Sequence, residues 1–372
     1  MKLQNLVGNP ANRAWYYVPT PRLTSDSSPY QLGFEHGKAF RHVIQTLLRD
    51  KVRKLNFDRN LEELTAPIEA RRNWLKNTFP DEYQENEGIA AGAEVSPLLT
   101  LFYNYYLGQG FPKNIPNVNI PHCTGFCMPG KYTDSGTICG NNCDDDAVYF
   151  LLEYTGTHWP KYIMATWFGM VGGFGGMNEF GLYIGDTGAS ILRQDDRLGP
   201  EHYTPSMMVF NLVLRYCKNV DEAVKLIARD DVMGHSNHIL ADVSGKACVV
   251  EKALAVSLTS YEITEKFAIG NFFHSEAKRD PDALKRLFKN QPGTESRYLS
   301  MLHHIEQSPR PFTAQRGKEI MASTYKARPE VKNYASVCNW HTQITYVALP
   351  QKKTIHISGK SPTDSNWLEY KF

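Results

Sequence analysis

HCTGFCMPGKYTDSGTICGNNCDDD, residues 122–146, is the stretch of sequence that decides the fold. It contains four of the seven cysteines of the chain. Two runs of strand-like composition, Thr124–Met128 and Thr137–Asn141, flank a turn rich in Pro, Gly, Asp and Ser. A β-hairpin would place Cys123 at the start of one strand and Asp144 just past the end of the other. Cys123 is therefore a candidate nucleophile, with the hairpin positioning a substrate carbonyl against it.

The composition of the whole chain is that of a globular protein. Its 372 residues are 42% hydrophobic and 12% aromatic, which is enough for a large core. A formal net charge of +2 gives no reason to expect nucleic acid or a membrane as a partner. The N-terminal sequence lacks a secretory apolar region, and no apolar run approaches the roughly 20 residues that span a bilayer. We therefore expect a cytoplasmic protein whose odd number of cysteines indicates free thiols.

The first 110 residues are expected to be mainly helical, because apolar residues recur at intervals of three and four. Helices are predicted at about Gln31–Leu55, Leu61–Asn77, Pro80–Gly92 and Pro97–Leu107. The next segment, FPKNIPNVNIP at 111–121, contains three prolines and three asparagines. Such a segment forms neither a long helix nor a central strand. We predict an exposed linker that leads directly to Cys123.

After Cys123 the sequence changes to short β-type runs with helices in blocks. Strands are predicted at Val148–Tyr154, Tyr162–Trp167, Gly181–Ile184, His238–Asp242, Ala247–Glu251, Ser257–Ile263, Phe267–Gly270, Gln343–Leu349 and Lys353–Ser358. Helices are predicted at about Ser206–Tyr216, Asp221–Ala228, Pro281–Lys289 and Glu295–Ile305. Antiparallel sets of strands with grouped helices indicate an α+β fold with layered sheets rather than a doubly wound fold.

Three kinds of site compete for the cysteine cluster. Cys123 with Cys127, and Cys139 with Cys143, form two CxxxC pairs that could ligate zinc, although structural zinc sites usually have tighter CxxC turns. The acidic run Asp144–Asp146 lacks the spacing of a calcium loop. A second alternative is that the cysteines are buried as small apolar residues. This alternative suits Cys127 and Cys139 better than it suits Cys123.

The third alternative is nucleophilic catalysis by Cys123. The thiolate is the reactive form, so Cys123 needs a base. No histidine stands out as that base, and the flanking sequence does not resemble the papain pattern. The candidates for a Cys–His pair are His122, His238, His274 and His341. A free α-amine, which titrates at roughly 7.7–8.0, is another base, and it requires a cut before Cys123 in the exposed linker.

Several motifs occur in order along most of the chain. They are Gln31–Gly37 (QLGFEHG), Gly88–Val95 (GIAAGAEV), Cys123-Thr124, Gly140–Asp144 (GNNCD), Gly176–Leu182 (GMNEFGL), His238–Glu251, Gly270–Phe273 (GNFF) and Ser296–Tyr298 (SRY). With these motifs the sequence resembles the N-terminal-nucleophile (Ntn) hydrolases that act on linear amides. Among them it is most similar to the penicillin acyltransferase family (isopenicillin-N N-acyltransferase, peptidase C45). Bile salt hydrolase, penicillin V acylase and acid ceramidase are relatives of this family.

The resemblance implies a fold and a reaction. The expected fold is a four-layer αββα sandwich of two antiparallel sheets with a mainly helical N-terminal pro-segment. Self-cleavage between His122 and Cys123 would leave residues 1–122 bound as a small subunit to the catalytic unit, 123–372. The implied chemistry passes through a thioester on Cys123, from which the acyl group of a linear amide goes to water or to another amine. It needs no metal or organic cofactor, and it is compatible with a CoA thioester as acyl donor and with a homo-oligomer.

The resemblance also implies a role for each site residue. Cys123 is the nucleophile, and its own freed amine is the base. Asp144 holds that amine by a charge-assisted hydrogen bond. Asn271 donates its amide to the tetrahedral oxyanion, while Asn178 orients the nucleophile or completes the oxyanion site. Arg297 supplies a positive charge near Cys123 that keeps the thiolate accessible.

Each role has a structural alternative. Asn178 could instead support a left-handed turn before Gly181. Asp144 could be a turn residue, Asn271 a strand-end amide, and Arg297 part of an ion pair on a helix surface.

The sequence departs from the family pattern at two positions. The residue before Cys123 is His122, where self-cleaving relatives more often have Gly or another small residue. Position 141 is Asn, where the bile salt hydrolase and acid ceramidase types have Arg, and this favours the acyltransferase branch. Four aromatic residues suit either an apolar acyl pocket or the core: Phe126, Trp167, Phe168 and Phe174. The rival hypotheses are an uncleaved or inactive protein of the same fold, a zinc-stabilised binding module, and a thiol hydrolase with His122 or His341 as base.

Overall fold

The computed structural model of the chain describes residues 20–54, 57–107, 123–144, 149–189, 202–254, 257–323, 336–339, 341–359 and 367–372. The predicted linker at 111–121 and His122 lie outside these residues. The predicted cut before Cys123 therefore stays a prediction.

The N-terminal part is mainly helical, as expected from its periodicity. Its described elements are β1 (Arg22–Ser25), α1 (Pro29–Ala39), α2 (Arg41–Lys54), α3 (Phe57–Thr78), α4 (Pro80–Ala93) and α5 (Pro97–Leu107). The bounds of α5 were predicted correctly, but the single helix expected at Gln31–Leu55 is wrong, because it is divided into α1 and α2. The division falls at Phe40, which leaves helical geometry with a φ of −116°. Its ring packs against Phe150 and Phe168, so a tertiary contact overrides the helical pattern.

Helices α1 and α4 cross at glycines, which explains two of the sequence motifs. A Cβ atom at Gly33 of α1 would lie 2.1 Å from the carbonyl oxygen of Glu85. A Cβ atom at Gly88 of α4 would lie 2.1 Å from the carbonyl oxygen of Tyr30. Only glycine permits so close an approach of two helix backbones. The QLGFEHG and GIAAGAEV motifs therefore specify a helix–helix contact.

The described strands form two sheets. The first sheet has the order β1-β4-β5-β6-β7-β8-β9-β10, and the second has the order β11-β2-β3-β12-β13-β14. The strands of the first sheet after β1 are β4 (Tyr149–Tyr154), β5 (Tyr162–Trp167), β6 (Gly175–Asn178), β7 (Tyr183–Gly188), β8 (Gly234–Ala241), β9 (Ala247–Leu254) and β10 (Ser257–Glu262). The strands of the second sheet are β11 (Phe267–Ile269), β2 (Thr124–Met128), β3 (Ile138–Asp144), β12 (Thr342–Leu349), β13 (Thr354–Gly359) and β14 (Leu368–Lys371). Neighbouring strands are antiparallel except that β1 runs parallel to β4.

The predicted hairpin at Cys123 is present, with one correction. Strand β2 has the predicted bounds, whereas β3 extends to Asp144. Asp144 thus ends the strand instead of following it, and the alternative that it is a turn residue is wrong. The sequence analysis also missed β6, because its Gly-Gly-Met-Asn sequence is typical of a turn.

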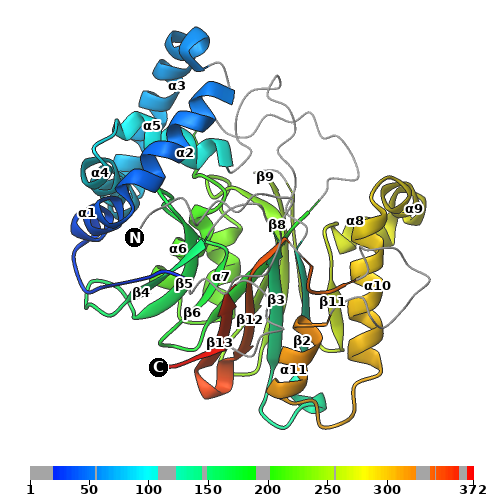
Figure 1. The fold of residues 1–372 in the computed structure, drawn as a ribbon. Coiled ribbons are helices and arrows are strands. Elements are labelled where there is room, and N and C mark those ends of the chain that lie inside the picture. Colours follow the sequence, from blue (N-terminus) through cyan, green and yellow to red (C-terminus); the bar gives the residue numbers. More distant parts are fainter. Residues whose placement is uncertain are drawn as a thin grey trace, which may run out of the picture.

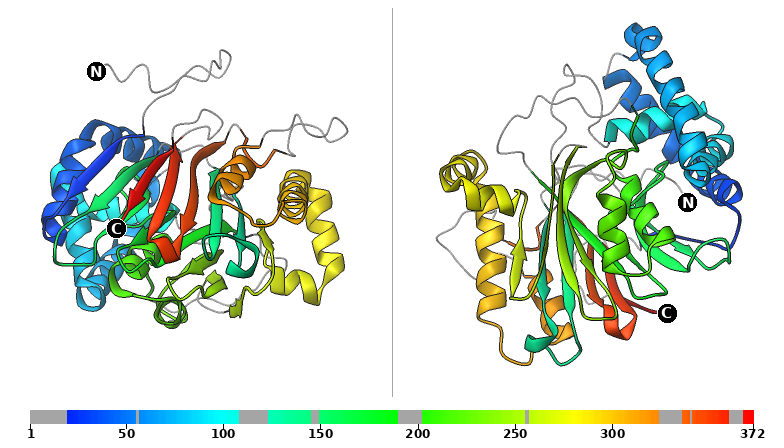
Figure 2. Two further views of the ribbon diagram at one scale, coloured as in Figure 1. Left: turned by 90° about the horizontal axis from the view of Figure 1, so that it is seen from below. Right: turned by 180° about the vertical axis from the view of Figure 1, so that it is seen from behind.

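Helices cover the outer faces of both sheets. They are α6 (Met208–Tyr216), α7 (Val220–Ile227), α8 (His274–Arg279), α9 (Pro281–Asn290), α10 (Pro292–Glu306) and α11 (Ala314–Met321). Helices α6 and α7 pack on the first sheet, and α10 and α11 pack on the second (Figure 1, Figure 2). The expected four-layer αββα sandwich is confirmed.

The alternation of side chains along the strands divides the core into layers. Within β2, Phe126 packs toward Met301 of α10, whereas its neighbour Cys127 belongs to the core between the two sheets. A further core joins the helices α1–α7 to the outer face of the first sheet. Residues of β2 and β3 therefore face either the partner sheet or the helices α10 and α11.

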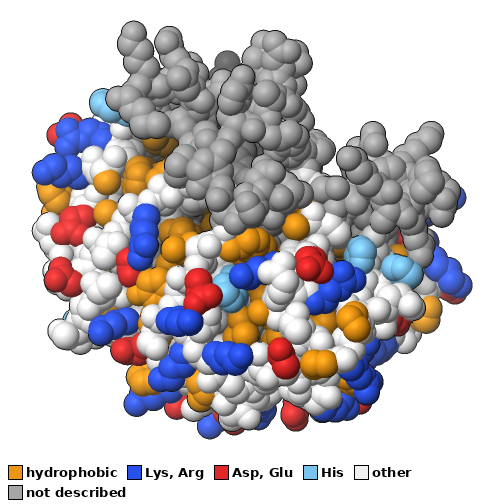
Figure 3. Space-filling view, turned by 60° about the horizontal axis from the view of Figure 1, so that its bottom comes forward, with side chains coloured by type: hydrophobic (Ala, Val, Ile, Leu, Met, Phe, Trp, Pro, Cys, Tyr) orange, Lys and Arg blue, Asp and Glu red, His pale blue; other side chains and the backbone are white. Residues whose placement is uncertain are grey.

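The distribution of charge on the surface and the character of the described helices agree with the sequence composition. Basic and acidic side chains are interspersed over the face seen in Figure 3. Among the helices of the described residues, we find none with the length and apolar character needed to cross a bilayer.

A buried ion network joins the N-terminal helices to the rest of the fold. Arg215 of α6 contacts Glu82 Oε1 at 3.1 Å and Glu85 Oε2 at 2.7 Å, both on α4. Its guanidinium also donates to the hydroxyl of Tyr162 and stacks on Trp159 at 3.9 Å. Burial raises the pKa of Glu82 to about 7, against the effect of Arg215. The network holds α4 against α6 because the positive charge of Arg215 balances the negative charge on these buried carboxyls.

A second polar contact links the two sheets directly. Asn141 Nδ2 of β3 donates to the carbonyl oxygen of Asp186 at 2.8 Å, and Asn141 Oδ1 accepts from the Asp186 N–H at 3.2 Å. The Asp186 side chain is itself buried, and its Oδ1 has no hydrogen-bond partner within the described residues. Burial raises the pKa of Asp186 from 3.8 to about 7, while a hydrogen bond with Ser236 acts in the opposite direction.

We predict that Arg215→Ala lowers the free energy of unfolding by about 3–5 kcal/mol, because it leaves buried carboxyls without their counter-charge. Denaturant unfolding followed by circular dichroism measures the loss. The control is Arg316→Ala, which removes a partly exposed ion pair with Glu319 and should cost about 0–1 kcal/mol. Equal losses in the two variants would contradict a role for the buried network.

We predict that Asp186 makes stability fall as the pH rises through the range between 3.8 and about 7. In that range the folded state keeps a proton that the unfolded state has released, so ionisation favours unfolding. The free energy of unfolding of Asp186→Asn, relative to that of the native protein, should therefore rise by about 2–3 kcal/mol from pH 5 to pH 8. Chemical unfolding at the two pH values measures this difference. The exposed Asp282→Asn serves as control, and a pH-independent difference for Asp186→Asn would refute the assignment.

Candidate active site

The register between β2 and β3 places a second cysteine beside Cys123. Thr124 lies opposite Asn142 in the antiparallel ladder, so the next step pairs Cys123 with Cys143. The two thiols are in hydrogen-bonding contact, and this contact together with burial raises the pKa of Cys143 well above its usual value. Cys143 Sγ also lies 3.4 Å from the carbonyl oxygen of Phe174. The environment of Cys143 therefore keeps it a neutral thiol.

The register between β2 and β11 places Asn271 on the other side of Cys123. Gly125 lies opposite Ile269, so two further steps bring Asn271 level with Cys123. Asn271 Nδ2 donates to the carbonyl oxygen of Gly188 at 2.8 Å, and its Oδ1 accepts from Arg297 Nη2 at 3.1 Å. A guanidinium can only donate, so Arg297 fixes which end of the amide is oxygen.

Arg297 lies in the first half of α10, which packs over β2 and β11. Its side chain is buried, with 3% of the residue exposed, so the alternative of a surface ion pair is wrong. Burial lowers the pKa of the Arg297 guanidinium, while the nearby Asp144 and Cys123 act to raise it. Arg297 Nε has no hydrogen-bond partner within the described residues. A buried, unpaired donor beside a thiol is typical of a functional site.

Asp144 ends β3 within a polar network. Asn339 Nδ2 donates to Asp144 Oδ2 at 2.6 Å, and Thr342 Oγ1 donates to Asp144 Oδ1 at 2.6 Å. The carboxylate is 1% exposed and lies close enough to Arg297 to influence its pKa. The fold therefore brings Cys123, Asp144, Asn271 and Arg297 together.

Asn178 is bound within a turn at the end of β6. Its Nδ2 donates to the carbonyl oxygens of Leu214 at 3.0 Å and Cys217 at 2.8 Å. Its Oδ1 accepts from the N–H groups of Phe180 and Leu182. One end of the amide thus serves the turn, and the other end binds the C-terminal end of α6.

The position of Asn178 along the sheet separates it from the other site residues. Asn178 is level with Leu182, whereas Asn271 contacts Gly188, six residues further along β7. At about 3.3 Å per residue, this separation is about 20 Å. The structure does not bring Asn178 to Cys123.

Two of the histidines proposed as bases are deeply buried. His238 packs against Phe210 of α6, and burial lowers its pKa to about 3. Burial also lowers the pKa of His274 to about 3, and His274 Nε2 accepts from the Gly270 N–H at 3.4 Å. A low pKa makes these imidazoles weak bases at neutral pH. The backbone N–H of His341 donates to Asn339 Oδ1 at 2.8 Å, beside the network of Asp144.

The cysteines of the hairpin are arranged in pairs. Cys139 Sγ lies 3.1 Å from Cys127 Sγ, and both are fully buried as small apolar residues, as expected for these two positions. Across the described residues, no group of three or more His, Cys, Asp or Glu side chains is arranged to hold a metal ion. The geometry therefore gives no support to the zinc alternative.

The four aromatic residues proposed for a pocket separate into two groups. Phe126 and Phe168 belong to cores that also contain helices. Trp167 and Phe174 pack together, with ring centroids 4.5 Å apart, and Phe174 contacts Cys143 through its carbonyl oxygen. The second pair alone lies on the side of the candidate site.

The structure adds site residues that the sequence analysis did not identify. They are Gly188, whose carbonyl oxygen orients Asn271, and Asn339 and Thr342, which hold Asp144. In the sequence, the register of the predicted hairpin was the one signal that could have placed Cys143 beside Cys123. Asn339 and Thr342 lie almost 200 residues after Asp144 in the sequence, and no local pattern indicates that contact.

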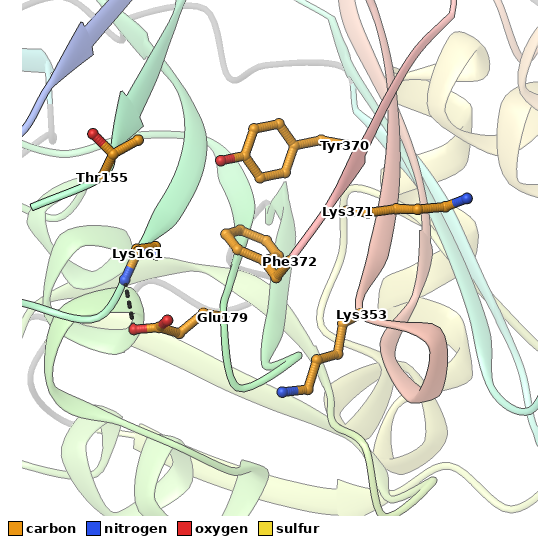
Figure 4. Close-up of a pocket in the computed structure, with 7 residues that line it drawn as sticks. All are labelled: Thr155, Lys161, Glu179, Lys353, Tyr370, Lys371 and Phe372. Carbon is orange, nitrogen blue, oxygen red and sulfur yellow. Dashed lines mark hydrogen bonds between the residues drawn. The ribbon is translucent and has the colours of Figure 1, made fainter.

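The structure also has a surface pocket, which Figure 4 shows. Its lining residues are Thr155, Lys161, Glu179, Lys353, Tyr370, Lys371 and Phe372. The Lys161 N–H donates to Glu179 Oε1 at 3.0 Å, and Glu179 follows Asn178 in the turn after β6. None of the predicted site residues lines this pocket.

Comparisons with known proteins place the chain in a family. The family model described as acyl-coenzyme A:6-aminopenicillanic acid acyl-transferase matches residues 133–343, more than half of the chain. The matched range includes Asp144, Asn271 and Arg297 and begins after Cys123. A search of curated protein sequences finds no match.

Several solved structures are similar to this chain at low sequence identity. Penicillin V acylase from Agrobacterium tumefaciens is 17% identical, with 64% of this chain and 83% of that chain covered and a TM-score of 0.43. The Caenorhabditis elegans ortholog of N-acylethanolamine-hydrolyzing acid amidase is 16% identical, with 62% and 93% covered and a TM-score of 0.42. A mutant of conjugated bile acid hydrolase from Clostridium perfringens is 13% identical, with 67% and 97% covered and a TM-score of 0.41.

The matched range contains β3 and the described strands and helices from β4 to α11. The chain belongs to the acyl-coenzyme A:6-aminopenicillanic acid acyl-transferase family, an Ntn-hydrolase family of amide hydrolases and acyltransferases.

Proposed function

We propose that the protein is a self-processing cysteine amidohydrolase or acyltransferase that forms a thioester on Cys123. The observation that carries this proposal is the convergence of three buried polar side chains, Asp144, Asn271 and Arg297, on the start of β2. Isolated buried polar groups are costly, and their clustering around one thiol favours a catalytic role. The substrate class is a linear amide, such as an N-acyl amine or an N-acyl amino acid.

The first proposed step is cleavage of the peptide bond between His122 and Cys123. Hydrolysis of that bond gives Cys123 a free α-amine, which is a base suited to neutral pH. Asp144 would hold this amine in place and would stabilise, by a charge-assisted hydrogen bond, the ammonium that forms once the amine has taken the thiol proton. The bonds from Asn339 and Thr342 keep the Asp144 carboxylate in place for that role.

The second proposed step is acyl transfer to the enzyme. The α-amine takes the thiol proton, and Cys123 Sγ attacks the substrate carbonyl to give a tetrahedral oxyanion. Asn271 would donate to that oxyanion through the amide nitrogen that Arg297 orients. The intermediate then breaks its C–N bond, and the leaving amine receives the proton from the α-ammonium. A thioester remains on Cys123.

The third proposed step releases the acyl group to water or to another amine. The same α-amine would remove a proton from the attacking water or amine, and the proton would return to the thiolate of Cys123. A CoA thioester could load the enzyme by the same attack, as the family's name implies for an acyl donor. The N-terminal segment 1–122 would remain bound, since β1 pairs with β4 and Arg215 contacts two carboxylates of α4.

We predict that the purified protein consists of two pieces, residues 1–122 and 123–372. The Cys123→Ala variant should remain a single chain, because it lacks the sulfur needed to attack the preceding carbonyl. Intact-mass spectrometry under denaturing conditions distinguishes the two states. Cys248→Ala, which removes a buried thiol of β9, is the control and should be cut normally. An uncut native chain would contradict the α-amine as base and favour a thiol hydrolase that uses His122 or His341.

We predict that Asn271→Ala lowers kcat for a chromogenic linear amide by roughly 10²–10³, since it removes an oxyanion donor. The matched comparison is Asn178→Ala, which removes two hydrogen bonds in the turn after β6 and two to the C-terminal end of α6. Asn178→Ala should mainly lower the melting temperature and should reduce kcat much less in the fraction that stays folded. Steady-state kinetics and thermal unfolding test both statements. An unchanged kcat in Asn271→Ala would remove this residue from the mechanism.

A further inference from the structure

The β2–β3 hairpin carries two cross-strand pairs of cysteines on one face. Cys127 lies opposite Cys139, and the register places Cys123 opposite Cys143 four residues along the strand. Residues two or four apart on a strand point to the same side. The core between the sheets contains Cys127, Cys139 and Cys143, and the thiol of Cys143 contacts that of Cys123. The proposed nucleophile therefore has a second thiol directly beside it.

The spacing of a cross-strand pair suits a disulfide. Opposite residues in an antiparallel ladder have Cα atoms about 4.5–5.5 Å apart. Disulfides join Cα atoms about 4.4–6.8 Å apart. Cys123 and Cys143 can therefore be linked without a change in strand register. Neither thiol is part of a disulfide in the structure.

The two cysteine pairs differ in their neighbours. Cys127 and Cys139 are completely buried among apolar side chains, and burial keeps the Cys139 thiol protonated by raising its pKa. Cys123 stands at the start of β2 beside the Arg297 guanidinium and retains 3% exposure. Oxidation follows nucleophilic character and access, so Cys123 is the member of the two pairs that an oxidant attacks first.

We infer that Cys143 is a resolving thiol that protects the nucleophile Cys123 through a reversible disulfide; the inference rests on the proposed function of Cys123. Hydrogen peroxide transfers one oxygen atom to the Cys123 thiolate, which becomes a sulfenic acid while hydroxide leaves. That hydroxide takes the proton of the Cys143 thiol and becomes water, the resulting thiolate attacks the Cys123 sulfur, and the S–O bond breaks with loss of hydroxide. A dithiol reductant returns both thiols and is itself oxidised to a disulfide.

This disulfide would have two consequences for the enzyme. It occupies the sulfur that attacks the substrate, so the oxidised enzyme is inactive. It also removes the sulfenic acid before a second peroxide converts it irreversibly to a sulfinic acid. Inactivation by peroxide is therefore reversible as long as Cys143 is present.

The test treats the native protein and Cys143→Ala with a small excess of hydrogen peroxide. Peptide mass spectrometry without reduction should find a Cys123–Cys143 linkage in the native protein. Dithiothreitol should then restore most of its initial amidase activity. In Cys143→Ala, Cys123 should accumulate as sulfinic acid, and dithiothreitol should restore little of that variant's own starting activity. Cys139→Ala, which removes a thiol from the other pair, should behave as the native protein does.

The inference is overturned if no Cys123–Cys143 peptide forms while Cys123 is oxidised, or if Cys143→Ala recovers as fully as the native protein. The linkage is read from peptide masses and does not require a working enzyme. A linked peptide in a protein without amidase activity would therefore refute the proposed function but keep the thiol pairing. Amidase activity without the linkage would refute the pairing alone.

Discussion

The antiparallel register of β2 between β3 and β11 is the constraint on which the candidate site depends. It brings together residues that are far apart in the sequence, with Cys143 on one side of Cys123 and Asn271 on the other. A slip of one residue would turn Cys123 from the space between the sheets toward α10 and α11. Phe126 and Cys127 face two different cores. A slip would put the large ring where the small thiol packs and the thiol where the ring packs, and this mismatch opposes it.

The N-terminal helices are fixed to this sandwich by contacts that tolerate little change. Glycines at the crossing of α1 and α4 let the two backbones touch, so that α4 presents both Glu82 and Glu85 to Arg215. Strand β1 adds a parallel edge to the first sheet beside β4. The segment before Cys123 is thus integrated into the sheet and the helical layer. A cut at its end would leave both contacts in place, because neither contact involves residues near position 122.

The layered α+β fold and the hairpin at Cys123 could be predicted from the sequence, because local composition and alternation specify strands and turns. The proximity of Asp144, Asn271 and Arg297 to Cys123 could be predicted, because each residue stands in one of the motifs that occur in order along the chain. The placement of Asn178 could not be, since a Gly-Met-Asn sequence suits an oxyanion donor and a turn equally well, and only the contacts with α6 decide between them. Asn339 and Thr342 could not be predicted either, because a pairing across almost 200 residues leaves no local pattern.

The same geometry favours the proposed α-amine over the imidazoles of His238 and His274 as the base. Among the described residues, the fold brings to the start of β2 an arginine, an amide and a carboxylate that are already bound to one another or to neighbouring side chains. Two of the histidines proposed as bases, His238 and His274, are kept neutral by desolvation and are weak bases near pH 7. A base carried by Cys123 itself needs no additional side chain in this packed layer. It requires only a carboxylate close to the start of the strand, and β3 supplies that group as Asp144 in its last position.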